Sequence, residues 1–355
     1  MDYNEIRRKT KKISVGNVAV GGNAPVSVQS MTNTDSSDFD ATYAQMKALC
    51  GVGCDIVRMT VPDENAVRTL ARLKESDIDI PIVADIHFDY KLAIASADAG
   101  ADKIRINPGN IGGEDRAAAV AKAAKAKGIP IRIGVNGGSL EKGILEKCGG
   151  DLAKAMVESA KRHIEILNRY DFDDIVLSMK SSDVRTTIAA YRLASQSFDY
   201  PLHLGVTEAG TLKTGIIKSA IGIGSLLADG IGDTIRVSLT DDPVKEVEAA
   251  KLILRALGMD DESIRVVSCP TCGRTKIDLI SIANKVTEET EKLKGKLKVA
   301  VMGCVVNGPG EAKDADIGIA GGDGCAVLFK KGEIIKKLPE DEIVDALMDE
   351  IRRMI

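Results

Sequence analysis

Residues 24–257 repeat one pattern, in which a short segment rich in β-branched residues is followed by a longer segment with helical composition. The predicted strands are residues 26–31, 55–60, 81–87, 103–107, 130–136, 174–180, 201–207 and 233–239. Between them, helical periodicity is found at residues 41–50, 64–74, 90–99, 114–127, 151–168, 184–197 and 243–257. Eight such units in roughly 235 residues have the size of a (β/α)8 TIM-like barrel. The predicted fold class is therefore α/β, with an N-terminal barrel.

A doubly wound open sheet is the alternative arrangement of the same units. Such sheets commonly carry a glycine-rich dinucleotide fingerprint directly after a strand. Here Gly222 and Gly224 follow Ser219 and Ala220 rather than a strand, so we interpret them as part of a loop or the start of a helix. The sequence therefore favours the barrel.

A second, smaller α/β domain is predicted after a polar linker at residues 258–263. Its expected elements are a strand at 264–267, a helix at 276–293, strands at 298–302 and 316–320, a hairpin at 326–335 and a helix at 341–354. The expected domains are thus a barrel domain at residues 1–257 and an α/β domain at residues 264–355.

The second domain carries three cysteines in loops that directly follow predicted strands. Cys269 and Cys272 form a C-x-x-C motif, Cys304 lies 32 positions after Cys272, and Glu311 follows seven residues later beyond a Gly-Pro-Gly turn. Three thiolates are too few for a closed four-cysteine site, and no histidine follows His203. A cluster held by three thiolates and one weak oxygen ligand leaves one iron able to exchange its ligand. The pattern favours a catalytic iron–sulfur site with Glu311 as the fourth ligand.

Other interpretations of these cysteines remain open. A lone C-x-x-C motif also occurs in zinc knuckles and in redox dithiols. Cys325 is the alternative fourth ligand, although it directly precedes a predicted hairpin and is typical of the first residue of a buried strand.

Composition limits the remaining possibilities. The chain has 355 residues, enough for two domains, and its net charge of −4 gives no reason to expect a nucleic acid as partner. No apolar segment is long enough to span a membrane, and the first residues lack the apolar core of a signal peptide. Seven cysteines without secretory context indicate reduced thiols in the cytoplasm.

The predicted strands bring cations into the barrel. Alternate strand residues point inward, and active sites lie at the carboxyl ends of barrel strands. The apolar residues of each strand are expected to face the helices, so the polar set fills the interior. That set holds five cations, here called the cation cluster: Arg58, Arg105, Arg132, Lys180 and Arg236.

Only Asp85 and loop residues such as Glu208 are expected to oppose the cation cluster. An internal ion-pair network is the plainer interpretation, but five cations do not balance one or two carboxylates. Because arginine matches phosphate oxygens in pairs, the sequence predicts a phosphate-rich small molecule here. The candidate substrate-binding residues are Arg58, His87, Arg105, Asn107, Arg132, Asn136, Lys180, Ser182, His203, Arg236 and Ser238.

Several motifs together resemble the signatures of the 4-hydroxy-3-methylbut-2-enyl diphosphate synthase family in its compact bacterial form. The motifs are SCPTCGRT at 268–275, VMGCVVNGPGEA at 301–312, VQSMTNT at 28–34, ADIHF at 84–88, RINPGN at 105–110 and IGVNGGSL at 133–140. The resemblance covers essentially the whole chain.

The resemblance implies the reductive ring opening and dehydroxylation of 2-C-methyl-D-erythritol 2,4-cyclodiphosphate, a step of the methylerythritol phosphate pathway of isoprenoid biosynthesis. It implies a [4Fe–4S] cluster on Cys269, Cys272, Cys304 and Glu311, with ferredoxin or flavodoxin as electron donor. Glu208 is then a candidate proton donor, although it could instead cap the next helix. Asn307, in the loop after Cys304, is a further catalytic candidate.

Two other classes of function compete with this one. The first is a phosphate-ester lyase or transferase with a structural zinc, and the second is a non-enzymatic cluster scaffold.

The geometry of a barrel also bears on the assembly, because the last barrel helix ends at the face opposite the strand carboxyl ends. A linker of six residues reaches at most about 20 Å. We therefore expect a homodimer in which each active site is shared between subunits.

Overall fold

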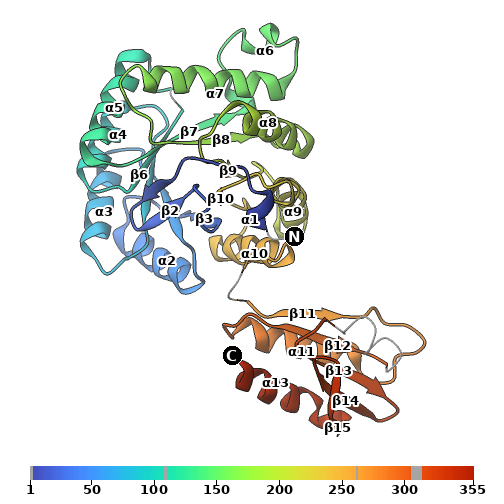
Figure 1. Ribbon diagram of the computed structural model, residues 1–355. Coiled ribbons are helices and arrows are strands. Elements are labelled where there is room, and N and C mark those ends of the chain that lie inside the picture. Colours follow the sequence, from blue (N-terminus) through green and yellow to red (C-terminus); the bar gives the residue numbers. More distant parts are fainter. Residues whose placement is uncertain (1–2, 108–109, 261–262, 305–313) are drawn as a thin grey trace. The chain divides into compact units, whose positions relative to one another are not determined.

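The computed structural model describes residues 3–107, 110–260, 263–304 and 314–355. The chain forms two compact units, Met1–Met259 and Asp260–Ile355 (Figure 1). Within the described residues, no helix is both long enough and apolar enough to cross a membrane.

The first unit is a barrel of parallel strands surrounded by helices (Figure 1). Its strands are β3 (Ser27–Met31), β4 (Ile56–Thr60), β5 (Ile82–Asp85), β6 (Lys103–Ile106), β7 (Ile131–Asn136), β8 (Ile175–Lys180), β9 (His203–Leu204) and β10 (Thr234–Ile235). They pair in the order β8-β7-β6-β5-β4-β3-β10-β9, and a parallel bridge between Leu177 and Leu202 joins the two ends. The predicted barrel is confirmed.

The last two strands are shorter than the sequence predicts. Beyond β9 and β10 the chain keeps single backbone bonds in place of a ladder, such as Arg236 N to Leu204 O at 3.0 Å and Thr207 N to Ser181 O at 3.3 Å. The barrel wall therefore continues past the regular strands.

Aspartate residues start most of the barrel helices. The helices are α2 (Phe39–Gly51), α3 (Glu64–Glu75), α4 (Tyr90–Asp98), α5 (Glu114–Lys127), α7 (Leu152–Asn168), α8 (Val184–Ser197), α9 (Leu212–Ala228) and α10 (Pro243–Ala256). The carboxylates that accept from backbone N–H groups in the first turn belong to Asp38, Asp63, Asp89, Asp151, Asp183 and Asp242. Such caps satisfy donors that the helix itself leaves free.

The interpretation of Gly222 and Gly224 as loop or helix start is wrong. Both lie inside α9, which no predicted helix covered. A Cβ atom on Gly222 would be only 2.6 Å from Cγ2 of Val206, so this glycine allows the helix to pack closely on the barrel wall.

The N-terminal residues close one end of the barrel. They form α1 (Tyr3–Ile6) and a hairpin of β1 (Ile13–Val15) and β2 (Val18–Val20), neither of which was predicted. Val15 and Val20 of the hairpin pack against Ile56 and Val83, the first inward-facing residues of β4 and β5. The floor of the barrel is therefore apolar.

Over its described residues, the second unit consists of a five-stranded sheet and helices α11 (Leu279–Glu291) and α13 (Ile343–Met354). The strands β11 (Arg265–Ser268), β12 (Lys298–Met302) and β13 (Ile317–Gly322) are parallel, and β14 (Cys325–Lys330) and β15 (Glu333–Pro339) continue the sheet antiparallel. Helices α11 and α13 pack together, the latter after a short 3-10 turn, Glu340–Glu342. Each element predicted for this region is present.

Candidate active site

The strand register arranges the inward-facing side chains in levels, each drawn from alternate strands. Following the register around the barrel, one level holds Arg58, Arg105, Ser178 and Arg236. The level toward the carboxyl ends holds Met31, Asp85, Gly134 and Gly205, and the next holds Thr60, Asn107, Lys180 and Ser238. Arg132 lies one level below the arginines. The cation cluster therefore faces one interior space, as predicted.

Asp85 holds two members of the cation cluster. Its carboxylate lies 3.0 Å from Nη1 of Arg105 and 3.5 Å from Nε of Arg58. Burial alone would raise the pKa of Asp85, but Arg58 and Arg105 hold it well below its ordinary value. Burial also lowers the pKa of Arg58 to about 10, although Asp85 partly opposes this effect.

Glu246 holds a third member and was missed by the sequence analysis. The expectation that only Asp85 and loop acids oppose the cation cluster is wrong, because this carboxylate enters from the first turn of α10. It lies 3.0 Å from Nη2 of Arg236 and also accepts from Leu239 N and Ser30 Oγ, each at 3.0 Å. A carboxylate three residues after a Pro that starts a helix was the available signal.

Arg132 and Lys180 have no carboxylate partner among the described residues. Arg132 is 1% exposed, and its Nε and Nη1 make no hydrogen bond with any described residue. Nζ of Lys180 lies 3.4 Å from Nε2 of the fully buried His203. Burial, reinforced by neighbouring arginines, holds the pKa of Lys180 well below its ordinary value. An internal ion-pair network therefore accounts for three cations of the cluster and leaves two.

Two glycines make room among these cations. A Cβ atom on Gly134 would be 2.5 Å from Nε of Arg105, and one on Gly205 would be 2.8 Å from Nζ of Lys180. Both glycines belong to one level, so the side chains of Arg105 and Lys180 can lie directly against the barrel wall at this level. A small, multiply charged anion suits this part of the barrel, because it would supply the negative charge that Arg132 and Lys180 lack.

The other candidate residues lie at the same end of the barrel or inside it. Asn107 is buried directly after β6, Asn136 is half-buried at the end of β7, and Ser238 is half-buried three residues after β10. His203 lies deeper, at the level of Arg132. Ser182 is exposed in the loop after β8.

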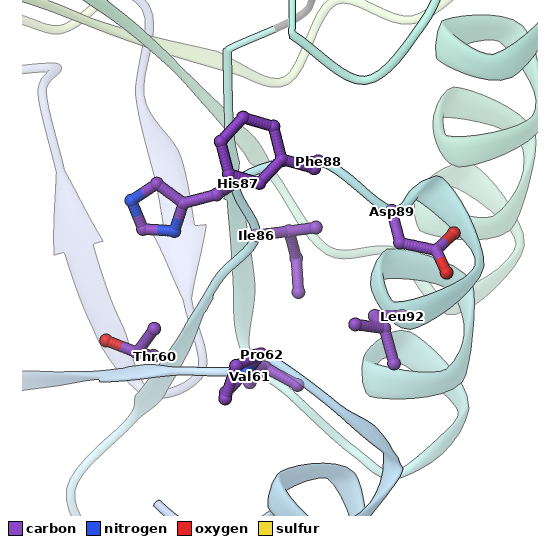
Figure 2. Close-up of a pocket in the computed structure, with 8 residues that line it drawn as sticks. All are labelled: Thr60, Val61, Pro62, Ile86, His87, Phe88, Asp89 and Leu92. Atoms are coloured by element: carbon purple, nitrogen blue, oxygen red, sulfur yellow. The ribbon is translucent and has the colours of Figure 1, made fainter.

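His87 lies at a cavity of about 240 Å³ between the loops that follow β4 and β5. Thr60, Val61, Pro62, Ile86, His87, Phe88, Asp89 and Leu92 line it (Figure 2). Figure 2 shows the imidazole of His87 pointing away from Asp89 and Leu92, and the side chain of Phe88 is 72% exposed. This cavity extends the mouth of the barrel with apolar surface.

Glu208 is exposed in the loop after β9 and has a left-handed backbone, with φ of 52°. This conformation is unfavourable for a residue with a side chain, by roughly 1 kcal/mol or more. The alternative role as a helix cap is wrong, because Thr211 occupies the N-cap position of α9. Glu208 therefore lies at the carboxyl end of the barrel with a strained backbone that helix capping does not explain.

The two described cysteine loops of the second unit touch each other. The backbone N–H of Gly303 donates to Sγ of Cys269 at 3.2 Å, and Lys276 N donates to Gly303 O at 3.0 Å. A Cβ atom on Gly303 would be 3.0 Å from Cγ2 of Thr275. Cys304, the next residue, is thereby placed beside the C-x-x-C loop, and the hydrogen bond to Sγ of Cys269 is of the kind that supports thiolate ligands.

The cysteines differ in exposure. Cys269 is half-buried, Cys272 exposed and Cys304 buried. Backbone and side-chain hydrogen bonds from Arg274 lower the pKa of Cys272. Within the described residues, no three His, Cys, Asp or Glu side chains lie close enough together to hold a metal ion. Glu311 and Asn307 lie outside the described residues, and Cys325 is the first residue of β14.

Comparisons with known proteins agree over both units. Residues 10–251 match the GcpE TIM-barrel domain, and residues 265–353 match the GcpE protein C-terminal domain. The 4-hydroxy-3-methylbut-2-en-1-yl diphosphate synthase (flavodoxin) of Caldanaerobacter subterraneus subsp. tengcongensis is 59% identical over 351 residues, covering 99% of this chain and 99% of that protein. The Bacillus subtilis (strain 168) protein of the same name is 56% identical over 353 residues, covering 99% and 93%.

A more distant solved structure supports the fold alone. A spore coat polysaccharide biosynthesis protein of Bacillus subtilis has a TM-score of 0.51 at 11% identity, covering 70% of this chain and 73% of that one. The family-model matches and the two closely similar relatives show more than the fold. The chain belongs to the GcpE family of 4-hydroxy-3-methylbut-2-en-1-yl diphosphate synthases, which are oxidoreductases.

Proposed function

We propose that the chain converts 2-C-methyl-D-erythritol 2,4-cyclodiphosphate to 4-hydroxy-3-methylbut-2-enyl diphosphate, with the diphosphate bound by the cation cluster. The observation that carries this proposal is the pair of buried cations without carboxylate partners among the described residues, Arg132 and Lys180. Arginine forks bind phosphate oxygens in pairs, and a lysine adds a point charge.

The cation cluster would orient the substrate as well as bind it. Arg58 and Arg105 are fixed by Asp85, and Arg236 by Glu246, so their guanidinium groups are held in place before a ligand arrives. Such preorganisation lowers the cost of binding and presents the carbon skeleton in one direction. Asn107, Asn136, Ser238 and His87 would complete the contacts near the mouth.

We further propose that Cys269, Cys272, Cys304 and Glu311 hold a [4Fe–4S] cluster. The donor set fits, because the two described cysteine loops touch and a backbone N–H donates to Sγ of Cys269. When bound, the cluster would supply electrons and Lewis acidity at the carbon–oxygen bond. Glu208 would deliver the proton to the departing hydroxyl, which gives a use for its strained backbone. Asn307, three residues after Cys304 in the sequence, would assist in catalysis.

The proposed reaction requires an electron donor, and the barrel geometry bears on the assembly. The names of the relatives specify flavodoxin, which supports flavodoxin as donor here; ferredoxin is the alternative. We propose a homodimer with active sites shared between subunits, in the cytoplasm. The homodimer is supported by the direction of α10, which runs away from the strand carboxyl ends. It is also supported by the short linker at residues 258–263 that follows this helix.

Anaerobic turnover tests the proposal. The purified protein, reconstituted with iron and sulfide, is given the cyclodiphosphate and a chemically reduced flavodoxin, and the product is identified by mass spectrometry. We expect a brown protein that forms the linear diphosphate. A colourless, zinc-containing protein that acts on phosphate esters without an electron donor would overturn the proposal in favour of a lyase or transferase.

A further inference from the structure

Lys103 is a buried cation that lies outside the cation cluster. It opens β6 and points into the barrel, on the same face of the strand as Arg105, because Ile104 and Ile106 pack outward in the main core. Its side chain is fully buried, and its Nζ makes no hydrogen bond with any described residue. A buried amine with no partner is strongly unfavourable as an ammonium, so its place in the barrel needs a physical reason.

The strand register places Lys103 directly beneath the proposed anion site. It shares a level with Ile56, Val176 and Thr234, and the level above holds Arg132. Ile56, at the level of Lys103, also packs against the apolar floor. Unpartnered polar atoms gather at these two levels and at the one below; they are Ser27 Oγ, Gln29 Nε2 and Oε1, Arg132 Nε and Nη1, His203 Nδ1 and Thr234 Oγ1.

The charges around Lys103 explain why it has no counter-ion. The titratable groups that face the barrel interior with it are Arg58, Asp85, Arg105, Arg132, Lys180, His203 and Arg236, together with Glu246 from α10. Both carboxylates of this set are occupied, Asp85 by Arg58 and Arg105, and Glu246 by Arg236. Burial, together with Arg132 and Arg58, holds the pKa of Lys103 well below its ordinary value, so the amine is disposed to be neutral in the empty barrel.

We propose that Lys103 is the deepest positioning residue of the anion site and takes up a proton when a diphosphate enters the barrel above it. The proposal rests on the proposed function, since it needs a diphosphate at the cation cluster. The step forms one N–H bond at Nζ with a proton from solvent, and no other bond changes. The new positive charge offsets part of the ligand charge and repels Arg132 upward, toward the ligand.

This device separates two requirements of the barrel. Without a ligand, one more ammonium among Arg58 and Arg132 would destabilise the fold, and a neutral amine avoids that repulsion. With a ligand, the same side chain adds to binding. Ligand binding and proton uptake therefore become one event, and departure of the ligand releases the proton.

Calorimetry of inorganic diphosphate binding tests the proposal. Titrations at pH 8 in buffers with different ionisation enthalpies report both affinity and the number of protons taken up. Lys103→Met is compared with the wild type and with Lys125→Met, a control on the exposed face of α5. We expect Lys103→Met to bind about ten-fold more weakly and to take up fewer protons, by up to about one. Lys125→Met should match the wild type in both.

The outcomes distinguish this inference from the proposed function. Unchanged affinity and proton uptake in Lys103→Met would overturn the role of Lys103 and leave the anion site intact. A wild type that does not bind diphosphate would overturn the anion site, and the role of Lys103 with it. The empty Lys103→Met and Lys103→Gln variants should be at least as heat-stable as the wild type. Failure of both to fold would also overturn the proposal, because it would show a structural role in the empty barrel.

Discussion

The guanidinium of Arg236 and the carboxylate of Glu246 form a two-point ion pair, with Nη2–Oε1 at 3.0 Å and Nε–Oε2 at 3.2 Å. The pair joins the end of a barrel strand to the first turn of α10, and Ser30 Oγ and Leu239 N bond the same carboxylate. Glu246 therefore serves both the fold and the orientation of one member of the cation cluster.

Replacing Glu246 should destabilise the barrel. Glu246→Gln leaves Arg236 without its counter-charge in a largely buried place, and breaking such a pair costs about 3 kcal/mol. Urea unfolding measures the change in the free energy of unfolding. Glu248→Gln, on the exposed side of the same helix, is the matched control and should stay within about 0.5 kcal/mol of the wild type. Equal stability of the two variants would contradict the structural role of the ion pair.

A methyl group at Gly134 should displace Arg105 from its place in the cation cluster. Gly134→Ala places a Cβ atom 2.5 Å from Nε of Arg105, so the guanidinium must move from its position beside Asp85. We expect diphosphate affinity to fall about ten-fold or more. Gly138→Ala is the control, because no atom lies within 4 Å of the added group. If both variants bind diphosphate like the wild type, the position of the Arg105 guanidinium does not determine diphosphate binding.

The cysteine variants test the cluster ligands. Cys269→Ser, Cys272→Ser and Cys304→Ser should lose the visible absorbance or most of the iron, because each removes a thiolate. Glu311→Ala should keep more iron yet lose turnover, since an exchangeable ligand is needed in the reaction rather than for assembly. Cys325→Ser is the control for a cysteine that is not a ligand. Full activity of Glu311→Ala, or loss of iron in Cys325→Ser, would contradict the assignment.

The empty barrel should become more stable as the pH rises from 6 to 9. Burial lowers the pKa of Lys180, so over this range the unfolded chain, with a lysine pKa near 10.4, binds more protons than the folded protein. The free energy of unfolding therefore increases with pH. Asp85 does not oppose this trend, because its lowered pKa contributes only below about pH 5. Lys180→Met should show a flatter profile in thermal unfolding, and an identical slope would refute the assignment.

Complementation between inactive variants tests the shared active site. Arg132→Ala disables the barrel and Cys304→Ser disables the cluster, so each homodimer should be inactive. If sites are shared, a mixed dimer contains one site with an intact barrel and an intact cluster, and about a quarter of the wild-type activity should return at equal mixing. Subunit exchange is verified with differently tagged chains. Exchange without recovered activity would place each site within a single chain.

Much of the barrel could be predicted because its signals are local. Period-two alternation identified the inward-facing arginines, and α5 and α8 begin and end where their helical periodicity does. The missed features depend on distant contacts. The partner of Arg236 comes from a helix rather than a strand. The packing role of Val15 and Val20 depends on their contact with Ile56 and Val83, which are distant in the sequence. The glycines of α9 lower helix propensity, and packing against the barrel wall overrides that signal.

The apolar floor closes the barrel at the amino-terminal ends of its strands. The hairpin of β1 and β2 fills the bottom with valine side chains, and a diphosphate cannot cross such a layer without losing its hydration. Substrate and product must then enter and leave through the same opening, at the carboxyl ends of the strands, one after the other. Each turnover ends only when the product has left, so the two diphosphates compete for a single passage and accumulated product slows the enzyme by occupancy alone.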